Sequence, residues 1–244
     1  MDSQTVEQLL AINRQFYSQF ARAFSETRSS AQTRLDRIVA YIADDVKVID
    51  LGCGNGRLAE RLEREGRRVN YLGVDSSRDL IALAVARKPN LHRVAAEFAV
   101  ADITSPNWNA ALASASFDLA VALAVLHHVP SFELRVAVLQ SIHALLKPGG
   151  TVILTNWHFE RNERLRKKVV PWQTVGIDER GLEPGDALLS WERGGVGYRY
   201  CHLLTMSEVQ RIAEQSGFQV IEQFYADADL NLYSVLRRAE GTKQ

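Results

Sequence analysis

The stretch that decides the fold is residues 46–56, VKVIDLGCGNG. Its first six residues form a short apolar run with β-branched side chains, which is typical of a buried strand. Three glycines then alternate with other residues, and residues 57–65 carry leucines at helical spacing. The pattern predicts a strand, a tight glycine turn and a helix.

The same alternation of strand and helix repeats along the chain. Further strands are predicted at residues 69–75, 98–103, 117–122 and 151–155, with helices at residues 5–24, 31–42, 57–65, 77–87 and 132–146. After a helix at residues 207–216, two strand-like runs at 218–224 and 231–236 suit an antiparallel hairpin that closes one sheet edge. We expect an α/β fold with a doubly wound, mostly parallel sheet.

Composition and charge narrow the classes of function. Hydrophobic residues make up 46% of the 244 residues and charged residues 24%, as in ordinary globular proteins. Lysine plus arginine equals aspartate plus glutamate at 29 each, so any RNA binding must rely on a local patch. The candidate patch is residues 161–168, RNERLRKK; the alternative is a solvated face of a short helix.

Three acids follow predicted strands at the edge where ligands of such folds bind. Asp50 precedes the first glycine, where a carboxylate suits a cationic ligand end better than a pyrophosphate. Asp75 can accept both hydroxyls of a ribose, and Asp102 can accept an adenine amino group while Ile103 faces the ring. Together these positions favour S-adenosylmethionine over a dinucleotide, although each acid alone could be a helix cap.

These motifs resemble those of the class I, seven-stranded methyltransferase superfamily over residues 46–155: IDLGCGNG, GVDSS, VADI, FDLAVALAVLHHV and LLKPGG. The resemblance implies S-adenosylmethionine as methyl donor and S-adenosylhomocysteine as product. It also implies that residues around Ala122, Leu123 and Val125 flank the methionyl group and the sulfonium. The residues expected to bind the donor are Asp50, Gly52, Cys53, Gly54, Asn55, Gly56, Asp75, Ser76, Asp102, Ile103, Ala122, Leu123 and Val125.

A closer resemblance is to the tRNA wobble-uridine carboxymethyl methyltransferases. It is carried by FYSQFARAFSETR at residues 16–28, GCGNGR at 52–57, AVLHHV at 124–129, VVPW at 169–172 and RYCHLL at 199–204. This resemblance implies a tRNA acceptor and a small zinc-binding activator protein as partner. Leu204 and Leu232 stand where that family usually has aromatic residues, which indicates a changed acceptor pocket.

An anionic acceptor needs a cation to position it, because a carboxylate is already ionised near neutral pH and needs no base. Arg28, Arg57, Arg199 and His202 are the candidates, with Arg28 and Arg199 preferred. Alternatively, Arg28 pins the N-terminal loop to the core, and Arg199 pairs with an acid of the insertion. For a neutral hydroxyl or amine acceptor, His127 is the candidate base.

No metal site is expected. His127 and His128 are neighbours that should point apart, no third ligand is spaced to join them, and Cys201 is expected to be packed. The tryptophans at 157, 172 and 191 could stack on a flat substrate or form the core of the insertion.

We expect one domain over residues 1–244, with a helical cap (1–45), a donor-binding core (46–160), an aperiodic lid insertion (161–200) and a last helix with the edge hairpin (201–244). Neither a signal peptide nor a membrane span is indicated, which favours the cytoplasm. A small-molecule methyltransferase is the alternative function, with its acceptor enclosed by the N-terminal helices and the lid. A donor-binding module without turnover is the third.

Overall fold

Seven strands form the main sheet, in the order β3-β2-β1-β4-β5-β10-β9. The computed structural model describes residues 1–26 and 32–239. The strands of this sheet are β1 Val46–Leu51, β2 Val69–Asp75, β3 Val94–Val100, β4 Phe117–Leu123, β5 Leu146–Trp157, β9 Phe218–Ala226 and β10 Asn231–Arg238. The first five strands are parallel, and β10 runs antiparallel to both β5 and β9. The expected doubly wound, mostly parallel sheet with a hairpin at one edge is confirmed.

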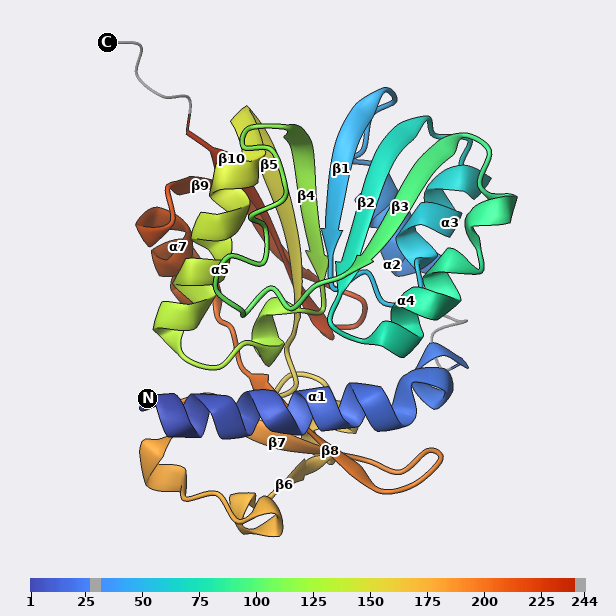
Figure 1. The fold of residues 1–244 in the computed structure, drawn as a ribbon. Helices are drawn as coiled ribbons and strands as arrows, with labels where there is room; N and C mark the ends of the chain where they lie inside the picture. The colour runs from blue at the N-terminus through green and yellow to red at the C-terminus, as the bar shows by residue number, and fades with distance from the viewer. Residues whose placement is uncertain (27–31, 240–244) are drawn as a thin grey trace.

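Helices cover both faces of this sheet (Figure 1). They are α2 Gln32–Val39, α3 Arg57–Arg64, α4 Arg78–Val85, α5 Phe132–Leu145 and α7 Met206–Gln215, whereas α1 Ser3–Glu26 crosses one end of the sheet. On one face, Leu139 of α5 and Ile212 of α7 are fully buried. On the other face, Ile38 of α2 and Leu62 of α3 are buried to the same degree. The strand order reverses between β1 and β4, so a ligand-binding crevice is expected beyond their carboxyl ends.

The third strand, β3, begins at Val94, four residues before the start that the sequence pattern indicated. It pairs with β2 from Val94 to Val100, and Val94 and Ala96 alternate inward. The predicted strand at 98–103 was wrong at its end, because residues 101–105 turn away from the sheet. Asp102 therefore lies in the turn that follows β3.

The insertion is more regular than its sequence suggested. It contains the short helix α6 Glu163–Arg166 and an antiparallel sheet of β6 Val169–Val170, β7 Asp186–Trp191 and β8 Gly197–His202. The expectation of an aperiodic segment was wrong, because alternating residues of β7 and β8 bury side chains on both faces of this small sheet. We call residues 161–202 the lid.

Helix α1 lies between the main sheet and the lid (Figure 1). Leu9 packs with Tyr200 and Leu188 of the lid, and Phe16 and Phe20 pack with Trp191. The side chain of Asn13 fixes this arrangement, since its amide donates to the carbonyl oxygens of His128 and Tyr200. The side-chain oxygen Oδ1 of Asn13 accepts a hydrogen bond from Tyr200 N at 2.9 Å. One buried side chain thus joins the helix to both the core and the lid.

Candidate functional site

A pocket opens at the carboxyl ends of β1, β2, β4 and β5, on the side where α1 crosses the sheet. Of the residues expected to bind the donor, those that line it are Asp50, Gly52, Cys53, Gly54, Asn55, Asp75, Ser76, Asp102, Ile103, Leu123 and Val125. Two expected residues do not line it. Gly56 begins α3, where an added Cβ would lie 3.1 Å from atoms of Ala84 and Phe98, and Ala122 is buried in the hydrophobic core.

The glycine turn brings backbone close to the ligand-binding space. Gly52 has φ +67°, and an added Cβ would lie 2.4 Å from a methyl carbon of Val125. Gly54 has φ +56° and nothing within 4 Å of an added Cβ, so its backbone borders open space. A ligand can therefore approach Gly54 without a side chain in the way.

The pocket presents buried carboxyl groups. Asp50 is 3% exposed and accepts a hydrogen bond from the Tyr71 hydroxyl. Burial raises the pKa of Asp50 to about 7, against the hydrogen bond from Tyr71 and with help from the charge of Asp75. Burial also raises the pKa of Asp75. Two desolvated carboxyl groups side by side favour a cationic ligand, which supports the expected assignment of Asp50 to an ammonium.

Two backbone amides hold the carboxylate of Asp75 in place. Oδ2 of Asp75 accepts from Gly54 N and Oδ1 accepts from Ser77 N, each at 2.9 Å. Each carboxylate oxygen has a second lone pair, so the group can still accept hydroxyl hydrogens from a ribose. Asp102 bonds to the backbone amide and hydroxyl of Thr104, and its Oδ2 lies 3.7 Å from Nη1 of Arg14.

Arg199 is a buried cation next to the pocket wall, although it is not itself one of the residues that line the pocket. It is 3% exposed, and its guanidinium carbon lies 4.8 Å from the ring centroids of both Phe16 and Trp157 and 5.3 Å from that of Trp191. Trp157 itself lines the pocket. Among residues 1–26 and 32–239, no carboxylate lies within 4.0 Å of Arg199, and its buried Nε has no hydrogen-bond partner. The alternative in which Arg199 pairs with an acid of the insertion therefore finds no support in the described part of the chain.

His202, a further candidate from the sequence, does not line the pocket. His202 is 2% exposed and lies between carboxylates, with Nδ1 2.7 Å from Asp186 Oδ1 and Nε2 2.9 Å from Glu208 Oε2. The idea that His202 holds the acceptor is wrong for this arrangement, because the ring joins the lid to α7. Arg28 lies outside the described residues.

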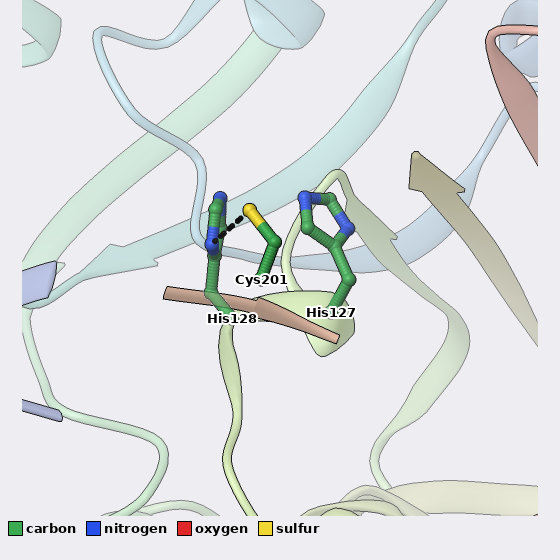
Figure 2. A group of neighbouring side chains, drawn as sticks. All are labelled: His127, His128 and Cys201. Atoms are coloured by element: carbon green, nitrogen blue, oxygen red, sulfur yellow. Dashed lines mark hydrogen bonds between the residues drawn. The ribbon is translucent and has the colours of Figure 1, made fainter. Parts of the chain in front are cut away.

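His127, His128 and Cys201 lie side by side (Figure 2). The expectation that the two imidazoles point apart was wrong: their ring centroids are 4.2 Å apart, because the 3₁₀ turn Leu126–His128 packs both rings on Trp157. Cys201, which was not foreseen as a third ligand, places its sulfur 3.6 Å from His128 Nδ1. Burial raises the pKa of Cys201 to about 12.

Existing hydrogen bonds favour a role for this group other than metal binding. Nδ1 of His128 lies 2.8 Å from the carbonyl oxygen of Tyr200 and so must donate to it, which leaves Nε2 as the acceptor for the Tyr17 hydroxyl at 3.1 Å. Only His128 of the pair lines the pocket; His127 is fully buried behind it. His128, rather than the predicted His127, is therefore the imidazole that faces the site.

Sequence reasoning expected the N-terminal helices to enclose the acceptor only in the alternative function, and it did not identify the residues of α1 that line the pocket. Leu10, Asn13, Arg14 and Tyr17 all line the pocket. Their spacing is helical, and they lie beside the apolar stripe that packs on the lid. An amphipathic helix with two buried stripes was the available signal.

Comparison with known proteins assigns the chain to a family. The profile of the family described as a methyltransferase domain matches residues 23–223, so the chain belongs to this family. The chain therefore carries a methyltransferase domain over most of its length.

Curated relatives carry more specific names. The tRNA (carboxymethyluridine(34)-5-O)-methyltransferase of Schizosaccharomyces pombe is 24% identical over 86% of this chain and 90% of its own length. The mouse protein with that activity in its name is 29% identical over 63% of this chain, which spans 21% of the mouse protein. A ubiquinone biosynthesis O-methyltransferase of Xanthomonas campestris is 33% identical over 50% of this chain and 48% of its own length.

Solved structures share the fold. A methyltransferase from Methanosarcina mazei has a TM-score of 0.63 at 24% identity, covering 83% of this chain and 97% of its own. A structure described as a complex of a Haloferax volcanii methyltransferase activator with a methyltransferase gives a TM-score of 0.67 at 18% identity, covering 96% and 100%. No helix within residues 1–26 and 32–239 is both long and apolar enough to cross a membrane.

Proposed function

We propose that this methyltransferase esterifies the carboxylate of a carboxymethyl group on the wobble uridine of tRNA. The observation that carries the proposal is Arg199, a buried guanidinium enclosed by Phe16, Trp157 and Trp191 without a carboxylate partner among the described residues. Burying an unpaired cation is costly, so a site that keeps one favours an anionic ligand. The names of the tRNA-modifying relatives support the same acceptor.

The donor-binding residues follow from the pocket. Asp50 is suited to the ammonium group, Asp75 to the ribose hydroxyls and Asp102 with Ile103 to the adenine. S-adenosylmethionine, when bound, supplies the methyl group: a carboxylate oxygen forms the new O–C bond while the S–C bond breaks and its electrons return to sulfur. Because the acceptor is already ionised, the protein needs to position it rather than deprotonate it.

The two sides of the pocket differ in charge, as donor binding and acceptor positioning require. Asp50 and Asp75 face the donor side with negative potential, whereas Arg199 lies beside Trp157 on the lid side. An indole next to a guanidinium suits a flat base that carries a carboxylate. We further propose that a small activator protein assists the enzyme, as the structure of the Haloferax volcanii complex suggests for a protein of the same fold.

The experiment uses purified protein, labelled S-adenosylmethionine and tRNA that carries carboxymethyl uridine, with and without an added activator protein. We expect label in tRNA that survives mild acid and is released by mild base, as an ester is. Arg199→Ala should abolish turnover, with donor affinity changed less than about twofold, and Arg199→Lys should restore it only in part. Base-stable label, or full activity of Arg199→Ala, would refute the proposal.

A second candidate function rests on His128. Its Nε2 accepts the hydrogen of the Tyr17 hydroxyl, and both residues line the pocket, so it could take a proton from a neutral hydroxyl acceptor through Tyr17, which gives its own proton to Nε2 and receives that of the acceptor. The Xanthomonas campestris relative is named for such an O-methylation. Base-stable label in a phenolic small molecule, together with loss of activity in His128→Ala but not Arg199→Ala, would identify this function instead.

A further inference from the structure

Arg164, Lys168 and Arg193 form a group of cations on the lid, which we call the lid cation cluster. They come from three segments: α6, the residue before β6, and the turn between β7 and β8. Trp191 links them to Arg199, because Lys168 Nζ lies 5.8 Å and Arg199 Cζ 5.3 Å from the centroid of its ring. The indole N–H of Trp191 also donates to the carbonyl oxygen of Arg193 at 2.6 Å.

Like charges are brought together here without compensating ion pairs. In the part of the chain that the structure describes, no carboxylate lies within 4.0 Å of Arg164, Lys168 or Arg193. Their neighbour Lys167, in contrast, pairs with Glu163 at 2.7 Å. Burial lowers the pKa of Lys168, and the charges of Arg199, Arg164 and Arg193 lower it further, with Glu192 opposing them. The protein therefore tolerates repulsion that an anionic partner would relieve.

The cluster extends from solvent to the buried acceptor site. Arg164 and Arg193 are exposed, Lys168 is half-buried over Trp191, and Arg199 is 3% exposed. A small anion could contact one end of this arrangement but not both. A chain of phosphates with one base inserted beside Trp157 matches it, because successive charges then meet successive cations.

We propose that Arg164, Lys168 and Arg193 bind the phosphodiester backbone of the single-stranded RNA that flanks the methylated nucleoside, while Arg199 receives the nucleoside itself. This inference rests on the proposed function and adds the surface by which RNA is held. It also reconciles an RNA acceptor with the net charge of zero, since attraction comes from one face of the lid rather than from the whole protein.

The test measures binding of a synthetic anticodon stem–loop RNA to the full chain by fluorescence anisotropy over a series of salt concentrations. The test variant is Arg164→Ala/Arg193→Ala, because both side chains are exposed and their loss leaves packing intact. The matched control is Arg93→Ala/Arg237→Ala, which removes the same charge from exposed residues at the opposite end of the main sheet.

We expect the test variant to bind RNA about tenfold more weakly and to lower the steepness of log K against log salt by about 1.4, at about 0.7 for each lost contact. The control should retain the wild-type steepness, and both variants should bind S-adenosylmethionine like the wild type. Equal losses in the two variants, wild-type binding by the test variant, or no RNA binding by the wild type would overturn the inference.

The same proteins separate this inference from the proposed function. If the test variant loses RNA affinity but the wild type forms no base-labile ester, the cluster is an RNA site and the proposed acceptor is wrong. If the ester forms and the test variant keeps the wild-type KM for tRNA, the acceptor assignment stands and the cluster does not bind the backbone.

Discussion

The hydroxyl of Tyr17 on α1 lies 3.1 Å from Nε2 of His128, the imidazole that faces the pocket. On the other side of the ring, Nδ1 lies 2.8 Å from the carbonyl oxygen of Tyr200 in the lid. The tautomer of His128 is therefore fixed by contacts from two elements that both lie outside the central sheet. The geometry of the pocket wall depends on α1 and the lid together.

Replacing Tyr17 with Phe should lower kcat by about two- to tenfold, because one hydrogen bond of about 0.5–1.5 kcal/mol no longer orients the ring of His128. The phenyl ring is retained, so the free energy of unfolding should change little. Tyr198→Phe is the control, since Tyr198 is a lid residue packed beside Leu9 and its hydroxyl makes no hydrogen bond to any residue that the structure describes. If both variants show the same kcat, Tyr17 does not position His128.

Donor affinity should depend on pH through Asp50, whose pKa is about 7 without ligand. Between pH 8 and pH 6 the carboxyl group becomes protonated and attracts an ammonium less, so binding should weaken by up to about tenfold. Calorimetric titration of the wild type and Asp50→Asn at both pH values measures this effect. The variant should bind weakly at both, and a pH dependence as steep as that of the wild type would contradict the assignment.

Asp50→Asn, which should weaken donor binding, should make the unliganded protein more stable than the wild type at high pH. Folding raises the pKa of Asp50 above its usual value of 3.8, so ionisation in the unliganded protein costs free energy as the pH rises from about 4 through about 7. Unliganded Asp50→Asn should therefore gain stability relative to the wild type when the pH is raised from 5 to 8. Urea unfolding at the two pH values measures the difference, and a constant difference would exclude a buried, ionising Asp50.

Gly52→Ala should destabilise the protein more than Gly66→Ala. Both glycines have a similar φ, +67° and +71°, so both substitutions introduce about 1–2 kcal/mol of backbone strain. An added methyl group at Gly52 would also meet Val125 at 2.4 Å, whereas nothing lies within 4 Å at Gly66. Overpacking of this kind costs about 1–3 kcal/mol more. Equal free energies of unfolding for the two variants would disprove the close contact.

His202 should stabilise the protein at low pH rather than high pH. Burial alone would lower its pKa, but hydrogen bonds to Asp186 and Glu208 outweigh it and raise the pKa above 6.5. The stabilisation is then complete below about pH 6.5 and is lost as the pH rises through the folded-state pKa. The wild type should thus exceed His202→Gln in unfolding free energy at pH 6 by more than at pH 9. A difference that grows with pH would show that the ring is buried uncharged.

The sequence predicted β1 and β2 to the residue, because each is a short apolar run that ends at a glycine turn or an acid. It also predicted that Asp50, Asp75 and the glycine turn meet, and they line one pocket, since the carboxyl ends of parallel strands meet at one edge. It failed for the lid, where β8 was not recognised as a strand. In a strand, Arg199 and Cys201 share one face, and Tyr200 and His202 the other, which separates Arg199 from His202, although the sequence made both candidates for holding the acceptor.

Helix α1 has two adjacent rows of side chains that contact different parts of the protein. Leu9, Phe16 and Phe20 support the lid, while Arg14 and Tyr17 border the donor pocket one residue further round the helix. A change that reshapes the lid for another acceptor would shift or rotate this helix and so disturb the donor pocket as well. We therefore expect changes in acceptor preference that reshape the lid to be accompanied by compensating substitutions in this N-terminal helix.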